Sequence, residues 1–257
     1  PEEKPYFLTN QSAGSFNTFK HSFEAGTGKF LNNLLSVSAR YSIINSDGYI
    51  DRAFSKLNSY NINALFEKGN TKLRFLTFGG KEKTYQAWNG IDKATYESNP
   101  KFNYSGAIYD ANWENIIGFY DNETDNYRQN HYHLLWEQKL GKIWNLETTF
   151  HLTHGEGYYE NYKQDAKFSK YDLPNIVENG NTITRTDFIR KKWLDNDFYG
   201  VVSNLYGNFE NLNLNFGVAA NQYFGRHFGN VSGVKYTDIF EHEYYRNNAL
   251  KNEVSGF

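Results

Sequence analysis

Histidines are the residues of this 257-residue sequence whose spacing is most suggestive of metal chemistry. His131 and His133 are two residues apart, so they would lie on the same side of a β-strand. Two imidazoles on one face suit a transition metal, but the sequence places no third ligand beside them. The segment 242–246 (HEYYR) begins like the zinc-protease motif HExxH, yet the second histidine is missing. The sequence therefore predicts no metal site and no catalytic residue.

Other motifs with established chemistry are equally incomplete. Residues 121–126 (DNETDN) are similar to the start of a calcium loop, but position six is Asn126 instead of glycine and position twelve is Tyr132. This excludes an EF-hand and leaves a looser, calcium-stabilised loop as an alternative. The sequence contains no G-x-S-x-G, P-loop or dinucleotide-binding fingerprint. We therefore predict that the chain is not an enzyme and requires no cofactor.

Aromatic side chains are the remaining candidates for a binding function. They make up 18% of a sequence whose mean hydropathy is −0.75, and they crowd two long polar segments, 80–125 and 158–195. Such rings can hold a flat or apolar ligand, or they can pack on one another into a compact cap, and the sequence leaves both interpretations open. The candidate ligand-binding residues are Tyr104, Tyr109, Trp113, Tyr158 and Tyr159. Tyr85 and Trp88, at the base of the first segment, are predicted to anchor the loop.

Long β-hairpins are the elements expected to position these residues, and the clearest one lies between residues 126 and 160. Its apolar residues keep one parity along each arm, as in Leu134 and Trp136 before the turn and Trp144 and Phe150 after it. Each arm has about a dozen residues, against roughly five or six in an ordinary strand. One apolar face, one polar face and aromatic ends are typical of transmembrane β-strands. A soluble β-sandwich could contain the same hairpin, so the lengths of the connections between strands have to distinguish the two folds.

The connections alternate in length along the whole chain. Short turns are expected near residues 29–33, 69–70, 141–142 and 210–211, and long polar loops at 80–125, 158–195 and 226–246. Outer-membrane barrels have short turns on one rim and long loops on the other, whereas a sandwich has no reason to sort its loops in this way. No run of about 18 apolar residues predicts a transmembrane helix. The predicted fold is all-β, the wall of an antiparallel, up-and-down transmembrane β-barrel.

Four blocks of the sequence resemble TonB-dependent outer-membrane receptors, particularly those of the Bacteroidota. These blocks are residues 46–52 (SDGYIDR), 80–90 (GKEKTYQAWNG), 155–160 (GEGYYE) and 193–200 (WLDNDFYG). The resemblance implies import of a scarce nutrient such as an iron chelate, haem, cobalamin or an oligosaccharide. It also implies a barrel of roughly 22 strands, closed by an N-terminal plug and energised by TonB.

The chain accounts for only part of such a barrel, because about nine to ten strands can be placed in it. Residues 1–257 are therefore expected to form part of a single β-barrel domain, with the plug domain outside this chain. The expected partners are the remainder of the same barrel and its plug, TonB through the missing N-terminal part, the lipid bilayer, and a small-molecule or glycan ligand. A net charge of −2 provides no basic stripe for nucleic acid.

The predicted function is that of a TonB-dependent receptor in the outer membrane of a Gram-negative cell, with its long loops extracellular. An iron chelate such as a siderophore, or haem, is the first candidate substrate, and an oligosaccharide is the second. Two alternatives belong to other classes of protein. One is an outer-membrane barrel enzyme with catalytic groups at its rim, and the other is a structural or adhesive surface barrel without transport.

Overall fold

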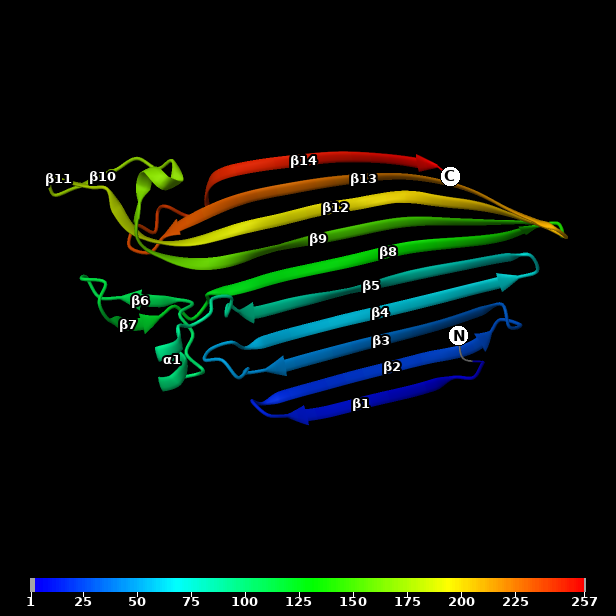
Figure 1. Cartoon of the computed structure of the whole chain (residues 1–257), viewed down its shortest axis with the longest axis horizontal. Coiled ribbons are helices and arrows are strands. Elements are labelled where there is room, and N and C mark those ends of the chain that lie inside the picture. The colour runs from blue at the N-terminus through cyan, green and yellow to red at the C-terminus, as the bar shows by residue number, and fades with distance from the viewer. Residues whose placement is uncertain (1–2, 257) are drawn as a thin grey trace.

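The computed structural model describes residues 3–256, so residues 1, 2 and 257 of the expected domain lie outside the described residues. Its main feature is one ten-stranded antiparallel sheet, ordered β1-β2-β3-β4-β5-β8-β9-β12-β13-β14 (Figure 1). The strands are β1 (Tyr6–Gly14), β2 (Thr18–Phe30), β3 (Leu35–Ser46), β4 (Ser55–Lys68), β5 (Thr71–Tyr85), β8 (Thr124–Leu140), β9 (Trp144–Lys167), β12 (Arg185–Phe209), β13 (Leu212–Gly233) and β14 (His242–Gly256). The sheet is a meander, because each strand pairs with the strands that precede and follow it in this order.

The alternation of side chains gives the sheet two different faces. On one face, called the outer face below, Phe75, Leu134 and Phe150 lie on β5, β8 and β9 in direct cross-strand register. All three of these large apolar side chains are exposed. On the opposite face, called the inner face, His133 and His151 lie directly opposite each other. An extended apolar surface is unfavourable in water, so the outer face is suited to contact with lipid.

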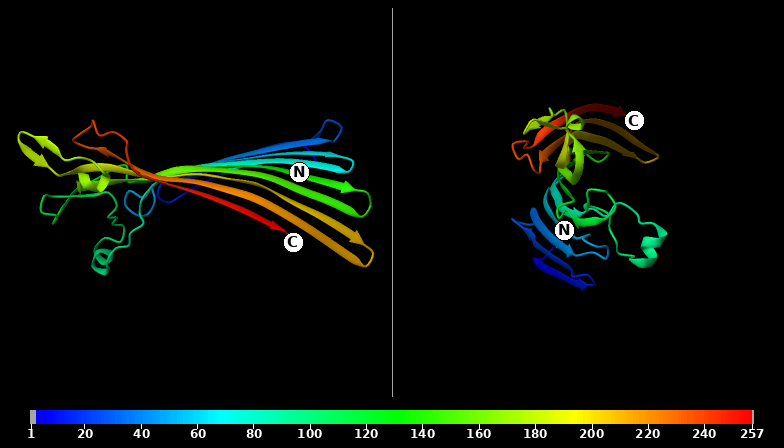
Figure 2. Two further views of the ribbon diagram at one scale, coloured as in Figure 1. Left: turned by 90° about the horizontal axis from the view of Figure 1, so that it is seen from above. Right: turned by 90° about the vertical axis from the view of Figure 1, so that its left-hand side faces the viewer.

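The two rims of the sheet differ in their connections, as the sequence predicts. At one rim, called the turn rim, residues 31–34, 69–70, 141–143 and 210–211 close tight hairpins. The left-handed backbone at Gly69 (φ 58°) and Gly141 (φ 75°) favours glycine there. At the other rim, called the loop rim, residues 86–123, 168–184 and 234–241 form longer connections, but residues 47–54 form a shorter one and residues 15–17 a tight turn. Figure 2 shows the strands fanning apart toward the turn rim and converging toward the loop rim.

The strands extend further toward the loop rim than the sequence predicts. Residues 158–167 and 185–195, expected in a long loop, belong to β9 and β12, so that prediction is wrong. Both faces of these strands carry polar and aromatic residues near the loop rim, so the apolar alternation that marks a strand disappears there. The first strand, Tyr6–Gly14, was also not predicted, because its sequence YFLTNQSAG lacks a sustained alternation.

The two longest loops contain small structures of their own. The loop at 86–123 holds α1 (Lys93–Ser98), β6 (Ala107–Tyr109) and β7 (Ile116–Phe119), and the loop at 168–184 holds the 3₁₀ helix η1 (Phe168–Tyr171), β10 (Ile176–Glu178) and β11 (Asn181–Ile183). Below the second loop, Phe168, Tyr171, Phe188 and Val231 form a buried hydrophobic cluster. The described helices are all too short or too polar to span a membrane. The packed apolar core therefore lies at the loop rim, and the sheet below it exposes both faces.

Candidate functional site

A buried polar network fastens the 86–123 loop to the sheet. The side-chain amide of Gln86, the first residue after β5, donates from Nε2 to the backbone oxygens of Thr124 (3.1 Å) and Glu160 (3.0 Å). The Oε1 atom of Gln86 accepts a hydrogen bond from Asn161 Nδ2 (2.9 Å). Gln86 and Asn161 are both buried. Because a buried polar group is costly without a partner, these bonds fix the position at which the loop leaves the sheet.

Glu123, at the other end of the loop, completes this network. One carboxylate oxygen accepts from Asn161 Nδ2 (2.8 Å), and the other accepts from the Tyr162 backbone N–H (2.8 Å). Burial raises the pKa of Glu123, while the hydrogen bonds from Tyr162 and Asn161 act in the opposite direction. The network formed by Gln86, Glu123 and Asn161 is called the loop clamp below.

Tyr85 lies directly beside the loop clamp, at the end of β5. Its ring is buried, and its hydroxyl lies 3.0 Å from the backbone oxygen of Ser105 and 2.8 Å from that of Tyr120. The guanidinium of Arg52 lies over the same ring, with Cζ 5.7 Å from its centroid. Tyr85 therefore connects the strand to two distant parts of the 86–123 loop.

The side chain of Gln164 joins the β6–β7 hairpin to the end of β9. Gln164 accepts from the Tyr109 backbone N–H (2.8 Å) and donates from Nε2 to the Tyr109 backbone oxygen (2.7 Å). The Tyr109 ring stacks on Trp113, with the centroids 5.7 Å apart and an interplanar angle of 26°. A cleft of about 480 Å³ lies between these rings and the sheet, with Tyr162 and Tyr171 also on its wall. Trp113 is 52% exposed, so its ring is accessible to a ligand.

The lining of this cleft, called the rim cleft below, is rich in cations. Its charged residues are Lys163, Lys167, Lys170, Arg185 and Asp165. The single carboxylate among the described lining residues, that of Asp165, pairs with Arg185 Nε at 2.8 Å. Burial lowers the pKa of Lys163, and the neighbouring Arg190 lowers it further. Several cations beside stacked rings suit an anionic ligand with a flat part.

The other predicted residues of the first loop lie outside the rim cleft. Tyr104 packs edge-on against Phe102, with the ring centroids 4.7 Å apart. Trp88 is 59% exposed and packs edge-on against Tyr159 at 5.6 Å. The structure therefore brings Tyr109 together with Trp113, and Trp88 together with Tyr159. Tyr104 belongs to neither group.

Tyr158 and Tyr159 were predicted to lie in a long loop, and their placement there is wrong. Both residues belong to β9, where neighbouring side chains point to opposite faces of the sheet. Tyr158 packs against Trp193 (4.3 Å between centroids), whereas Tyr159 lies near Lys192, whose Nζ is 5.9 Å from the ring centroid. The two tyrosines therefore cannot contact one ligand from the same side.

Known structures match the whole ten-stranded sheet. A chain in the structure of the FpvAI–pyocin S2 complex aligns with a TM-score of 0.63 and 10% identity, over 100% of this chain and 35% of that one. The siderophore receptor PiuA from Acinetobacter baumannii aligns with a TM-score of 0.58 and 11% identity, over 98% of this chain and 38% of its own. The ferric preacinetobactin receptor BauA from the same organism aligns with a TM-score of 0.55 and 12% identity, over 97% of this chain and 35% of its own. The chain has the fold of part of a receptor barrel.

The prediction of an antiparallel barrel wall that forms part of a larger barrel is thus confirmed. At 10–12% identity the likeness establishes the fold alone. This chain spans little more than a third of each of these solved chains. No protein-family profile and no curated protein sequence matches it.

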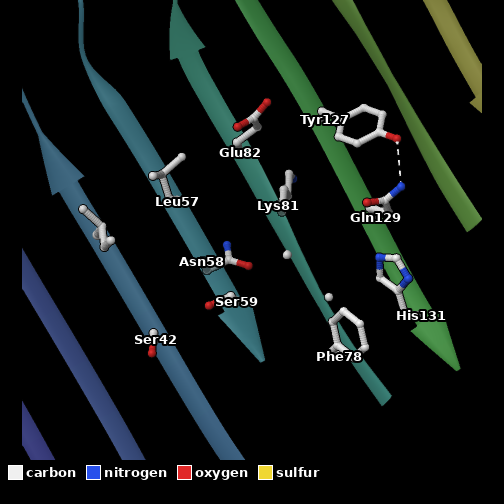
Figure 3. A pocket seen from close by; sticks show the side chains of 13 residues that line it. Ser42, Leu57, Asn58, Ser59, Phe78, Lys81, Glu82, Tyr127, Gln129 and His131 are labelled. Carbon is white, nitrogen blue, oxygen red and sulfur yellow. Dashed lines mark hydrogen bonds between the residues drawn. The ribbon is translucent and has the colours of Figure 1, made fainter. Parts of the chain in front are cut away.

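The inner face of the receptor-barrel wall carries an open groove of about 470 Å³ across β3, β4, β5 and β8 (Figure 3). In this groove the Phe78 ring stacks on His131, with the centroids 4.4 Å apart. His131 and His133 share the inner face, as the sequence predicts, with their rings 6.1 Å apart, and His151 lies 6.4 Å from His133. His131 Nδ1 is 2.9 Å from Thr153 Oγ1. Stacking and hydrogen bonding account for these positions without a metal.

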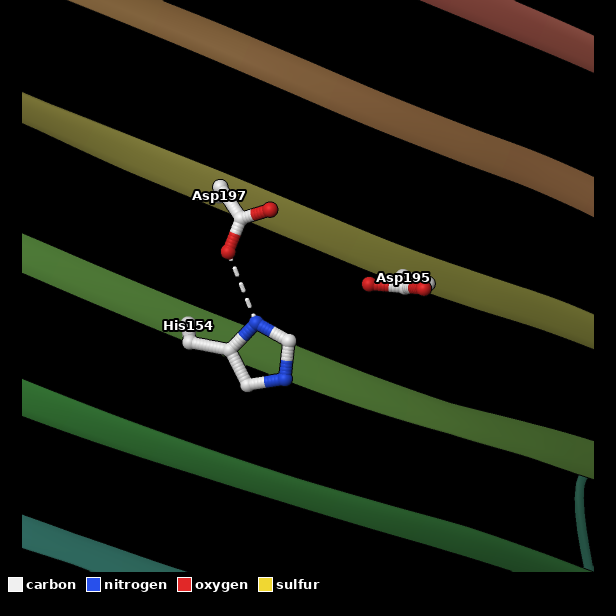
Figure 4. Close-up of side chains that lie close together, drawn as sticks. All are labelled: His154, Asp195 and Asp197. Carbon is white, nitrogen blue, oxygen red and sulfur yellow. Dashed lines mark hydrogen bonds and ion pairs between the residues drawn. The ribbon is translucent and has the colours of Figure 1, made fainter.

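A second histidine cluster lies on the outer face of the receptor-barrel wall (Figure 4). Ligand atoms of His154, Asp195 and Asp197 lie within 4.8 Å of one another, and His154 Nδ1 is 2.8 Å from Asp197 Oδ1. Arg226 Nη2 lies 2.6 Å from Asp195 and 3.3 Å from Asp197, so the two carboxylates already share a cation. No sequence pattern predicts this cluster, because strand register alone brings His154 beside Asp197.

Proposed function

We propose that this chain forms part of the barrel wall of a TonB-dependent outer-membrane receptor that imports a scarce nutrient. An iron chelate or haem is the first candidate substrate, and an oligosaccharide is the second. Of the solved chains with the same fold, PiuA is named a siderophore receptor and BauA a ferric preacinetobactin receptor, which supports the first candidate. The four sequence blocks alone support a receptor of the Bacteroidota type.

The outer face and the sheet edges support a location in the outer membrane. Phe75, Leu134 and Phe150 would face lipid, and the loop rim would be extracellular. Within the described residues, β1 and β14 each pair on one side only, and unpaired strand edges are costly in lipid. The proposal therefore includes further strands of the same barrel, a plug domain inside it, and TonB as the partner of the plug.

The rim cleft is the observation that carries the proposal. Function has to be argued from a site, since one fold can serve many activities. The rim cleft combines stacked, partly exposed rings with several cations at the rim that an external solute would reach first. A ferric chelate or haem with carboxylate or phenolate groups offers the flat surface and the negative charge that these side chains complement.

Alanine substitution of the stacked rings tests this function. Tyr109→Ala and Trp113→Ala are each expected to weaken uptake affinity several-fold, because an aromatic contact contributes about 0.5–1.5 kcal/mol. The measurement is uptake of labelled ferric chelates and haem, at limiting concentration, by cells that carry the full-length protein. Tyr96→Ala is the matched control, since Tyr96 is an exposed ring of the same loop outside the rim cleft.

Surface labelling measures barrel assembly, and assembly is expected to be unchanged in all three variants. Normal uptake at limiting substrate after removal of residues 92–122 would show that the loop is only a cover, and the proposal would fail. Equal effects of the Tyr96 and Tyr109 variants would contradict the rim cleft as the capture site.

A further inference from the structure

A cavity of about 540 Å³ lies on the inner face near the loop rim, with lining residues on β5, β8, β9, β12, β13 and β14. It adjoins the open groove on the same face, because Glu82 and Tyr127 line both (Figure 3). Glu82 is four residues from Phe78 and Tyr127 is four residues from His131, so all four side chains belong to the inner face. The cavity, called the inner cleft below, shares none of its described lining residues with the rim cleft. It is therefore a separate place at which a solute could bind.

Glu82 and Asp125, the two carboxylates of the inner cleft, lie beyond the part of the wall that would cross the membrane. A tilted strand crosses the hydrocarbon in about 9–11 residues, or roughly five on each side of the midplane. Glu82 is seven residues from Phe75 on β5, and Asp125 is nine residues from Leu134 on β8. In the proposed barrel both carboxylates therefore lie near the extracellular mouth, where an incoming solute would meet them.

These two carboxylates have no counter-charge of their own. They are diagonal neighbours in the sheet, since Glu82 pairs directly with Tyr127 on β8. Within residues 3–256, neither Glu82 nor Asp125 forms an ion pair or accepts a hydrogen bond from a side chain. Burial raises the pKa of both carboxyl groups, and the charge of Asp125 raises the pKa of Glu82 further. A cation bound between them would stabilise the ionised forms.

Tyrosine rings line the same cavity. Tyr127, Tyr159 and Tyr245 contribute to the lining from β8, β9 and β14. Two of these rings lie against glycine, because a side chain at Gly157 would collide with Tyr127 and one at Gly229 would collide with Tyr245. The faces of tyrosine rings attract cations, and rings combined with carboxylates are suited to an organic ammonium group.

The remaining ionisable residues of the lining are one lysine and one histidine. Lys192 is the single lysine or arginine among the described lining residues, and its Nζ lies 5.9 Å from the Tyr159 ring centroid. The two carboxylates thus leave the inner cleft with one excess negative charge when His227 is neutral. The Nε2 atom of His227 is buried without a hydrogen-bond partner in the part of the chain that the structure describes. A neutral imidazole can accept at this nitrogen, and an ammonium offers three N–H donors.

We propose that the inner cleft binds a protonated amine of the imported solute, with Glu82 and Asp125 as its counter-ions and the tyrosine rings around its carbon atoms. The inference rests on the proposed function, which brings a solute to the inner face of the barrel. It narrows the substrate class to iron chelates or saccharides that carry an amine, and it disfavours haem, which has none. Because the rim cleft suits an anionic group, a solute with groups of both signs would complement both cavities.

The experiment uses the full-length protein that contains this chain, reconstituted in phosphatidylcholine nanodiscs. The probe is 4-fluorophenethylammonium, compared with its N-acetyl derivative, which keeps the ring but has no charge. Fluorine NMR line broadening measures binding, and the signal from empty nanodiscs is subtracted. The wild-type protein is expected to bind the ammonium at least about fivefold more tightly than the amide. The double variant Glu82→Gln/Asp125→Asn, which keeps the shape of both side chains, is expected to lose this preference.

Further variants separate the inner cleft from general electrostatics. The matched control Glu137→Gln/Glu147→Gln removes the same charge from two directly opposed carboxylates near the turn rim, and it is expected to change binding by less than about twofold. Lys192→Gln removes the competing cation and is expected to strengthen ammonium binding about two- to threefold. Tyr127→Leu is expected to weaken ammonium binding several-fold, whereas Tyr127→Phe keeps the ring face and retains it. Heat-modifiable migration in gels confirms that each variant is folded.

Three results would overturn the inference. These are the absence of ammonium binding by the wild-type protein, equal binding of the ammonium and the amide, and equal losses of binding in the two double variants. Uptake by cells that carry the full-length protein tests the proposed function separately. If these cells import an iron chelate, haem or an oligosaccharide but the protein does not prefer the ammonium, this inference alone fails. If they import none of these nutrients, the proposed function is contradicted, whichever probe the protein binds.

Discussion

Leu134→Arg is expected to destabilise the membrane-inserted barrel by roughly 2–4 kcal/mol, the cost of an arginine that faces lipid near the bilayer midplane. Leu134 lies between Tyr132 and Trp136 on the same face of β8, and it pairs directly with Phe75 and Phe150. Phe150→Arg on β9 is expected to have a similar effect, because its side chain occupies the same apolar row. The measurement is the free energy of unfolding of the full-length protein refolded into lipid vesicles.

Substitutions on the inner face are the controls for this prediction. Thr149→Arg introduces the same side chain one residue from Phe150, but on the polar side of the sheet. Glu137→Gln changes one member of a partly exposed ion pair with Lys72 (3.1 Å), which is worth little on its own. Both are expected to cost far less than the lipid-facing changes. Equal penalties on the two faces would contradict the assignment of the outer face to lipid.

Gln86→Leu is expected to release the 86–123 loop from the sheet. Leucine fills the space of the amide but leaves the oxygens of Thr124 and Glu160 and the Nδ2 of Asn161 with one hydrogen-bond partner fewer. Each buried polar group left unpaired costs about 1–3 kcal/mol. The predicted result is faster amide hydrogen exchange across residues 86–123 and earlier protease cleavage there, with the strands below unaffected.

Asn115→Ala is the control for the Gln86 variant. Asn115 Nδ2 donates to Asp110 (2.8 Å) in the same loop, but this bond is exposed to solvent. Its loss is therefore expected to have little effect on exchange or cleavage. If the Gln86 and Asn115 variants opened the loop equally, the loop clamp would not be what holds it.

The sequence predicted the strands well where lipid and a polar interior impose opposite requirements on neighbouring residues. The turns at 69–70 and 210–211 and the arm that contains Leu134 and Phe150 follow directly from this alternation. The upper parts of β9 and β12 could not be predicted in the same way. There both faces carry polar and aromatic side chains, as Tyr158 and Tyr159 show, so the periodicity contains no signal.

The candidate site could be predicted only in part. The density of rings in one segment pointed to Tyr109 and Trp113, which the structure brings together. Gln164, which holds Tyr109 in place, is 55 residues away in the sequence. Lys163 and Arg185 come beside the rings because β9 and β12 continue to the loop rim. A single sequence carries no local pattern for such contacts, since they depend on strand register and loop folding.

The strand lengths make the mouth of this wall slanted. β2, β3 and β4 have 13, 12 and 14 residues, whereas β9, β12 and β13 have 24, 25 and 22. A bilayer is crossed by about 9–11 residues of a tilted strand, so the later strands stand far above the level at which the earlier ones end. In the proposed receptor, a bulky solute would therefore meet a lower wall near β1–β4 and a taller wall at β9–β13. A solute that arrived obliquely over the lower strands would reach the rim cleft, which lies against the taller ones.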